Sequence, residues 1–155
     1  MIGLIRFLHL LALGVWVGKI AFFSFVVAPA IFSTLGPERA GEVVSGIFPR
    51  YYAVGTAAAA VAVATSLLLA RRAAFPGWWR GVAVSVALGL AAMLWAATVV
   101  HPRAQRLRVT LQASGQAPSG NDAFRRAHRD AVVLNAAALL AGLVGLGLTA
   151  GALRE

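Results

Sequence analysis

The sequence predicts an all-α membrane protein, built as a bundle of four transmembrane helices. Of its 155 residues, 60% are hydrophobic and only 12% are charged. A soluble chain of this length has too small an interior to hide so many apolar side chains. A helix needs about 20 apolar residues to cross a bilayer, and four stretches reach that length. The predicted spans cover residues 5–32, 51–70, 78–100 and 129–153, so we expect one membrane domain over residues 1–155.

Breaker residues separate the first two predicted spans. The stretch Ser33-Thr34-Leu35-Gly36-Pro37 is typical of a turn. Residues 38–48 then carry polar side chains on one side and apolar ones on the other, which predicts a short interfacial helix between spans 1 and 2. We expect Pro49 to end this helix. Farther along, Asn121 or Asp122 is the expected N-cap of the last helix.

Two further prolines lie close to the ends of predicted spans. Pro29 is expected to kink or close the first span. Pro102 is expected to stop the third span and to push His101 toward an extended conformation.

Lys19 is the most unusual residue of the first span. It lies thirteen residues from both Arg6 and Phe32, about 20 Å of helix from either end, which is too far to reach water easily. An ammonium group at that depth costs roughly 2.5–3.5 kcal/mol. The side chain must lose its proton, meet a water-filled cavity or pair with an anion. We therefore expect Lys19 to face the interior of the bundle.

A polar stripe marks one face of the last span. Phe124, His128 and Asn135 recur at helical spacing and share that face. Asn135 lies two turns inside the apolar run, where a buried amide needs a partner. One interpretation is an interhelical hydrogen bond that fixes packing. The other is a polar track that leads from His128 through Asn135 toward Lys19.

The second interpretation extends to a binding vestibule beside the two long connections. Its predicted residues are Arg39, Arg50, Tyr51, Arg103, His128 and Asn135, with Lys19 deeper. We predict no catalytic residues, because no nucleophile–base pair, phosphate-binding loop or pair of acids is visible. The arginines gather at span ends, where anionic lipid headgroups are the expected partners and nucleic acid is not.

Histidines offer the only candidate ligands for a metal or cofactor. His101 and His128 share one rim of the bundle and could bind a metal together, although without cysteine or a buried carboxylate they do not close a site. His9 lies at the opposite rim, where it is either an interfacial histidine or a ligand to haem. We expect no cofactor, with haem as the alternative.

Small residues recur four apart in every predicted span. Gly14 and Gly18 in the first span are one example, and Gly147 and Gly151 in the last are another. Such spacing lets membrane helices approach closely, either within the bundle or between copies. We expect a homo-oligomer.

Several motifs in order along the chain resemble a known family. They are the segments His9–Trp16, Ala28–Phe32, Ile47–Tyr52 and His101–Arg103, followed by Phe124, His128 and Asn135. Together they resemble the four-span membrane proteins that include vertebrate transmembrane protein 205, a family of largely unassigned function. The resemblance implies a four-span fold and, from the vertebrate member, a link to platinum-drug tolerance, export or vesicle traffic. This chain has no cysteine and two methionines, so it offers few soft ligands for platinum. A more distant similarity, through His9, is to copper-resistance D-type proteins and haem-binding membrane protoporphyrinogen oxidases.

The expected function is a non-enzymatic role in the transport of, or tolerance to, small solutes or metal complexes. We expect the protein in the bacterial inner (cytoplasmic) membrane. Two alternatives remain: a haem-binding membrane redox protein that uses His9, and a structural or assembly subunit. Arginines lie on both sides of the predicted bundle, so the positive-inside rule leaves the orientation undecided.

Overall fold

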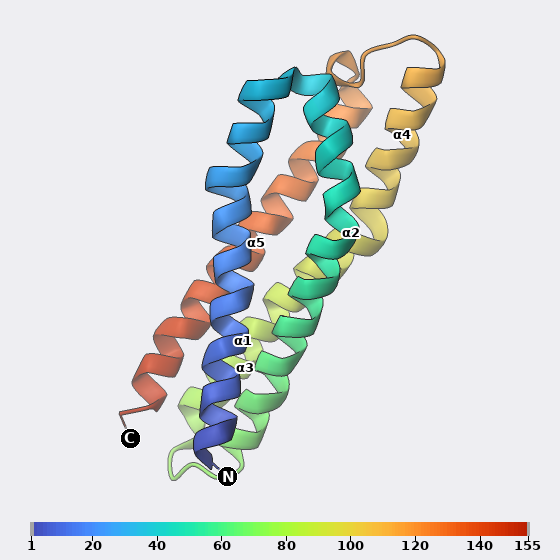
Figure 1. The fold of residues 1–155 in the computed structure, drawn as a ribbon. Helices are drawn as coiled ribbons and strands as arrows, with labels where there is room; N and C mark the ends of the chain where they lie inside the picture. Colours follow the sequence, from blue (N-terminus) through green and yellow to red (C-terminus); the bar gives the residue numbers. More distant parts are fainter. Residues whose placement is uncertain (1, 155) are drawn as a thin grey trace.

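The computed structural model describes residues 2–154, and over that range the chain is helical and has no strand. This confirms the all-α class. Figure 1 shows an elongated bundle with both chain ends at the same end of the molecule. The elements are α1 (Ile2–Phe22), the π-helical segment η1 (Phe23–Val27), α2 (Ala28–Ala70), α3 (Pro76–Trp95), the π-helical segment η2 (Ala96–Val100), α4 (His101–Ala113), the 3₁₀ turn η3 (Pro118–Gly120) and α5 (Asp122–Ala152).

A reversal at Gly36 divides α2 near its beginning. Gly36 has φ 71° and ψ 167°, a conformation that residues with a side chain rarely adopt. The chain folds back here, so that α1 and the later part of α2 lie side by side and run in opposite directions (Figure 1). The turn predicted at residues 33–37 is confirmed.

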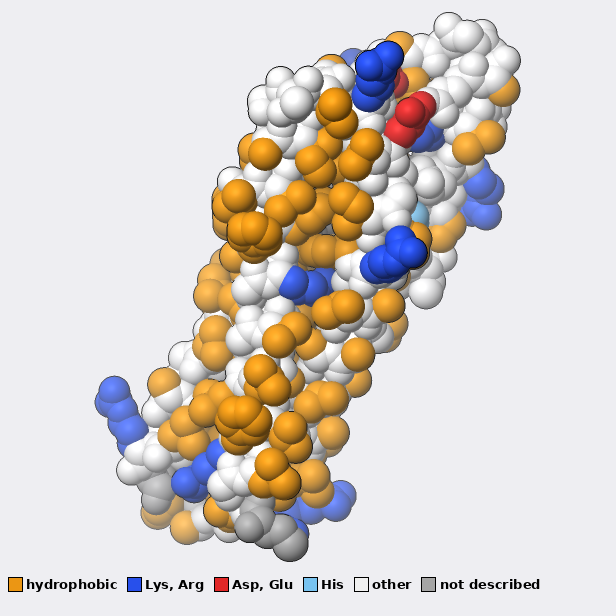
Figure 2. Space-filling model, viewed as in Figure 1, with side chains coloured by type: hydrophobic (Ala, Val, Ile, Leu, Met, Phe, Trp, Pro, Cys, Tyr) orange, Lys and Arg blue, Asp and Glu red, His pale blue; other side chains and the backbone are white. Residues whose placement is uncertain are grey.

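Three helical stretches are long and apolar enough to cross a membrane: Ile2–Ala70, Pro76–Ala113 and Asp122–Ala152. The first of them contains the reversal at Gly36. In Figure 2, hydrophobic side chains cover the middle of the molecule, while Lys and Arg side chains gather mostly toward its two ends. Large apolar side chains such as Phe25 and Leu88 are about two-thirds exposed or more, at 72% and 66%. This surface fits a membrane protein, because lipid tails can cover it.

The expected interfacial helix is not a separate element. α2 instead continues through Pro49 to Ala70 without a break at that proline. A proline inside a helix removes one backbone hydrogen bond. Here the neighbouring Phe48 ring packs against Phe23 at 5.8 Å and against His101 at 5.3 Å between ring centroids. This tertiary packing holds the segment helical and overrides the local preference of the proline.

Two π-helical segments carry the chain past Pro29 and Pro102. The amide of His101 bonds back five residues to the carbonyl of Ala96, and an equivalent bond precedes Pro29. The extra residue in a π turn accommodates a proline that would otherwise clash with the turn before it. The helix that contains the third predicted span therefore does not end at Pro102, as was expected, but continues into α4. His101 is helical, with φ −61° and ψ −48°, rather than extended.

Trp16 occupies the centre of the core and is fully buried. Glycines on two other helices let them approach this part of α1. A Cβ added to Gly89 of α3 would lie 2.4 Å from the ring atom Cη2 of Trp16, and one added to Gly142 of α5 would lie 2.6 Å from Cγ2 of Val17 and 3.4 Å from the Trp16 ring. These glycines let α1, α3 and α5 meet over one aromatic side chain.

Replacing Gly89 with alanine is expected to destabilise the bundle. The added Cβ would also lie 2.9 Å from the Cβ of Ala141, so the neighbours would have to shift. Overpacking of this kind costs about 1–3 kcal/mol, which exceeds the gain in helix propensity of about 1 kcal/mol. Gly147→Ala is the control, since a Cβ there has nothing within 4 Å. Denaturation in detergent micelles should show a loss for Gly89→Ala alone, and equal effects of the two variants would contradict this account of the core.

Candidate functional site

A chamber of about 580 Å³ lies between η1, α2, α4 and α5. This volume is within the range of pockets that bind small molecules. Most of its wall consists of aromatic and aliphatic side chains. The polar groups include Glu38, His101, Arg108, His128 and Asn135.

One wall of the chamber is a cluster of five rings, which we call the aromatic cluster. Its centre is Phe48, whose centroid lies 5.6 Å from that of Tyr52 and 6.0 Å from that of Tyr51. The ring of Phe23, from η1, lies 5.0 Å from that of Tyr51. The ring of His101, from α4, lies 5.8 Å from that of Tyr52. Tilted and edge-on contacts at these distances are favourable and give the wall a defined shape.

Tyr51 links this wall to the polar residues predicted from the sequence. Its hydroxyl donates to Oδ1 of Asn135 at 2.7 Å, and Nδ2 of Asn135 donates to Oγ of Ser24 at 3.0 Å. Lys19 donates from Nζ to the carbonyl oxygen of Tyr51 at 2.9 Å, and the same Nζ lies 3.4 Å from the centroid of the Tyr51 ring. Lys19 thus faces the bundle interior, as predicted. A Cβ on Gly55 would lie 2.3 Å from Nζ, so the glycine provides the space.

Asn135 therefore bridges α5, α2 and η1, which is the packing role that the sequence allowed. It also joins Tyr51 and Lys19 in one polar chain, and Asn135 and His128 both line the chamber. Lys19 itself does not line the chamber, since it lies against Tyr51.

Arg108 is a charged residue of the chamber wall that sequence reasoning did not single out. It is partly buried, and its Nη1 atom is buried with no hydrogen-bond partner. Its guanidinium lies against Gly41, where an added Cβ would overlap it, and 5.2 Å from the centroid of the Phe124 ring. Arg108 follows His101 by seven residues, two helical turns, so the same face of α4 carries both. That spacing was the signal available in the sequence.

Two carboxylates, Glu38 and Glu42, lie near enough to attract the charge of Arg108, but no ion pair among the described residues joins either of them to its guanidinium. Glu38 accepts from Oγ of Ser119 at 2.6 Å, and Glu42 accepts from Nε2 of Gln112 at 2.9 Å. The ion pairs found within residues 2–154 involve other arginines. The guanidinium of Arg108 thus faces the chamber without an ion-pair partner among the described residues.

His101 and His128 line the same chamber, from α4 and α5. Nε2 of His101 is buried and has no hydrogen-bond partner. No group of three or more His, Cys, Asp or Glu side chains in the described part of the chain could hold a metal ion. A metal held by these two histidines stays a prediction. Three other predicted vestibule residues are exposed and do not line the chamber: Arg39, Arg50 and Arg103.

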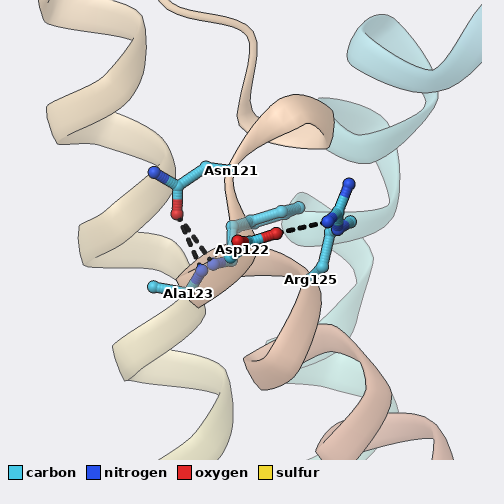
Figure 3. A network of polar contacts seen from close by, with 5 residues as sticks. Asn121, Asp122, Ala123 and Arg125 are labelled. Carbon is cyan, nitrogen blue, oxygen red and sulfur yellow. Dashed lines mark hydrogen bonds and ion pairs between the residues drawn. The ribbon is translucent and has the colours of Figure 1, made fainter.

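The start of α5 is fixed by a cap that the sequence predicted. The side chain of Asn121 accepts from the backbone amides of Ala123 and Phe124 at 2.9 and 3.1 Å. Figure 3 shows this cap beside the ion pair between Asp122 and Arg125. An Asn cap and an acidic residue in the first turn both stabilise a helix start. The cap sets the position of the face that carries His128 and Asn135.

His9 lies in a separate buried cluster at the other end of the bundle. Its Nδ1 is 2.8 Å from Oγ1 of Thr65, and its Nε2 is 3.1 Å from Oγ1 of Thr149. Its ring packs edge-on against Trp79, with 5.5 Å between centroids. A haem ligand needs one ring nitrogen directed at the iron. In this arrangement both nitrogens of His9 have protein partners, and the side chain ties α1 to α2, α3 and α5.

Comparison with known proteins gives a family for this fold. The Domain of unknown function (DUF4149) matches residues 11–113, about two-thirds of the chain. The chain belongs to this family. The matched range includes the aromatic cluster and Arg108, and it ends before α5, which carries His128 and Asn135.

A relative described as "Uncharacterized protein" from Aquifex aeolicus (strain VF5) is 41% identical over 64 residues. The match covers 41% of this chain and 46% of the relative, so it spans about half the length of that protein. No solved structure matches the DUF4149 chain.

The bridge between Tyr51 and Asn135 is expected to stabilise the DUF4149 fold. Asn135→Leu removes both hydrogen bonds of the amide, and Tyr51→Phe removes only the one that the two residues share. Interhelical hydrogen bonds in membrane proteins contribute about 0.6–2 kcal/mol. Denaturation of both single variants and the double variant should give a coupling energy in that range. A coupling energy of zero would show that the bridge contributes nothing.

Thr149→Val is expected to destabilise the cluster around His9. The variant keeps the side-chain shape but removes the hydroxyl that contacts Nε2, and an unsatisfied buried polar group costs about 1–3 kcal/mol. Thr98→Val is the matched control, because Thr98 is exposed and its hydroxyl bonds only to the carbonyl of Leu94. Thermal denaturation should separate the two variants. Similar melting temperatures would mean that the histidine does not depend on this threonine.

Proposed function

We propose that this DUF4149 protein crosses the membrane four times and takes part in the transport of, or tolerance to, small solutes or metal complexes. The four crossings follow if the reversal at Gly36 lies outside the bilayer, because it divides the first long apolar stretch into two. The spans are then residues 5–32, 51–70, 78–100 and 129–153. The bacterial inner membrane is the proposed location, and the Aquifex relative is compatible with it.

The chamber is the observation that carries this proposal. It has the volume of a small-molecule site, and its walls come from elements far apart in the sequence. Two buried nitrogens in its wall, Nη1 of Arg108 and Nε2 of His101, have no partner in the protein. Leaving buried polar groups unpaired costs free energy, and a bound solute would recover it.

The resemblance to the four-span family that includes transmembrane protein 205 favours tolerance as the cellular role. Several of its motif residues, among them Phe48, His101 and Asn135, lie in the chamber wall. We do not propose haem binding by His9, because both of its ring nitrogens contact threonine hydroxyls. Self-association stays a prediction, for which Gly14 and Gly18 offer an open face of α1.

Filling the chamber with a bulky side chain is expected to abolish the function. Ala131 lines the chamber, so Ala131→Trp should occupy part of it. Cells with the wild-type protein should survive at least one of three stresses better than cells with an empty vector: benzoate, ethidium or cisplatin. Cells with Ala131→Trp should lose that advantage, because the solute no longer fits.

Ala137→Trp provides the control, since it adds the same bulk to an exposed position of α5. Melting temperatures of the purified variants check that both fold. Full protection by a well-folded Ala131→Trp protein would contradict the proposal, and so would the absence of protection by the wild type against all three compounds.

A further inference from the structure

We infer that the ligand of the chamber is an amphipathic organic anion, an aromatic carboxylate whose charge binds Arg108 and whose ring packs on the aromatic cluster. The inference rests on the proposed function, since it names the class of solute that the chamber takes. It follows from the charge of the wall, from the position of Arg108 and from the nature of the remaining surface.

The charge of the chamber wall favours an anion. Arg108 and Arg125 line it together with one carboxylate, Glu38, which attracts Arg108 without forming an ion pair with it and accepts a hydrogen bond from Ser119. Arg125 forms an ion pair with Asp122 at the start of α5. Arg108 is therefore the cation without a partner among the described wall residues. A guanidinium presents paired N–H groups that match the two oxygens of a carboxylate.

The neighbours of Arg108 hold its guanidinium in place. One of them is the backbone at Gly41, where any Cβ would lie 2.2 Å from Nη2. Another is the Phe124 ring, 5.2 Å from Cζ, a distance that suits a cation–π contact. These contacts limit the movement of a long side chain, so less conformational entropy is lost when an anion binds. Gly41 is thus a positioning residue for Arg108.

Aromatic rings form the surface that would contact the rest of the ligand. His101 lies seven residues before Arg108 on the same face of α4, which places the two about 10 Å apart along the helix. His101 belongs to the aromatic cluster and packs there against Phe48 and Tyr52. A molecule with its carboxylate at Arg108 would therefore extend its apolar part toward these rings. Flat ring systems pack well against tilted and edge-on aromatic side chains.

Binding of a matched pair of probes tests the inference directly. The probes are 2-naphthoate and its neutral amide, 2-naphthamide, which have nearly the same shape. The full-length protein is placed in phosphatidylcholine nanodiscs, and affinities are measured by titration calorimetry. We expect 2-naphthoate to bind at least ten-fold more tightly than the amide. Ala131→Trp should weaken the binding of both probes, because it fills the chamber.

Variants of Arg108 test whether this residue causes the preference for 2-naphthoate over the amide. Arg108→Gln should bring the two affinities within about two-fold, because the charge is gone. Arg106→Gln, at an exposed position of the same helix, should leave the ten-fold preference unchanged. Gly41→Ala keeps every charge but displaces the guanidinium, so it should reduce the preference, whereas Gly46→Ala, with nothing within 4 Å of its Cβ, should not. The glycine pair keeps the test valid if Arg108→Gln fails to fold.

The outcomes separate this inference from the proposed function. Equal binding of acid and amide, both weakened by Ala131→Trp, would contradict the inference that the ligand is an anion. It would leave the proposal that the chamber binds a solute intact. No binding of either probe, together with full stress protection by Ala131→Trp, would overturn both. Nanodiscs of phosphatidylglycerol distinguish a lipid headgroup from a free acid. One result would overturn the inference: this lipid raises the melting temperature only when Arg108 is present, and 2-naphthoate does not bind. The anion at Arg108 would then be a lipid headgroup rather than an aromatic carboxylate.

Discussion

A single cation in the middle of an apolar helix has to be satisfied inside the protein, and Tyr51 does this for Lys19. Its carbonyl accepts from the ammonium group and its ring lies beneath the same group. Its hydroxyl reaches Asn135 on α5, which continues the chain of contacts to Ser24. Tyr51 therefore connects α1, α2 and α5 at this depth of the bundle. The chamber wall depends on that arrangement, because Phe23, Phe48 and Tyr52 of the aromatic cluster pack against Tyr51.

Buried polar side chains have protein partners at one end of the bundle and partly lack them at the other. Around His9, two threonines from distant parts of the chain contact both ring nitrogens, and the cluster is closed. Around the chamber, one nitrogen of His101 and one of Arg108 are left without a protein partner. A stable fold tolerates such groups only at a cost, which is most easily understood where a ligand compensates for it. The cluster around His9 therefore supports the structure, whereas the unpartnered nitrogens near Arg108 are the basis of the proposed binding site, although Nε1 of Trp16, away from the chamber, is unpartnered as well.

Local signals in the sequence predicted the parts of the fold that depend on local chemistry. The turn at Gly36, the cap at Asn121 and the inward direction of Lys19 each follow from one residue and its immediate setting. The passage of α2 through Pro49 could not be predicted, because ring packing across the bundle overrides the preference of the proline. Among many arginines, only the tertiary structure shows that Arg108 faces the chamber. The direction of that side chain depends on a π-helical turn earlier in the helix, which Pro102 accompanies but does not by itself predict.

The π-helical segment Ala96–Val100 also sets the rotational phase of the helix that follows it. One residue corresponds to about 100° of rotation around a helix axis. If the same chain continued in α-helical register, His101 and Arg108 would turn away from the chamber together, although no side chain of α4 had changed. A helical wheel drawn through α3 and α4 as one helix therefore misassigns every face beyond residue 100. For a protein built in this way, gaining or losing one residue in the segment would change what the chamber can bind more than most substitutions of its wall.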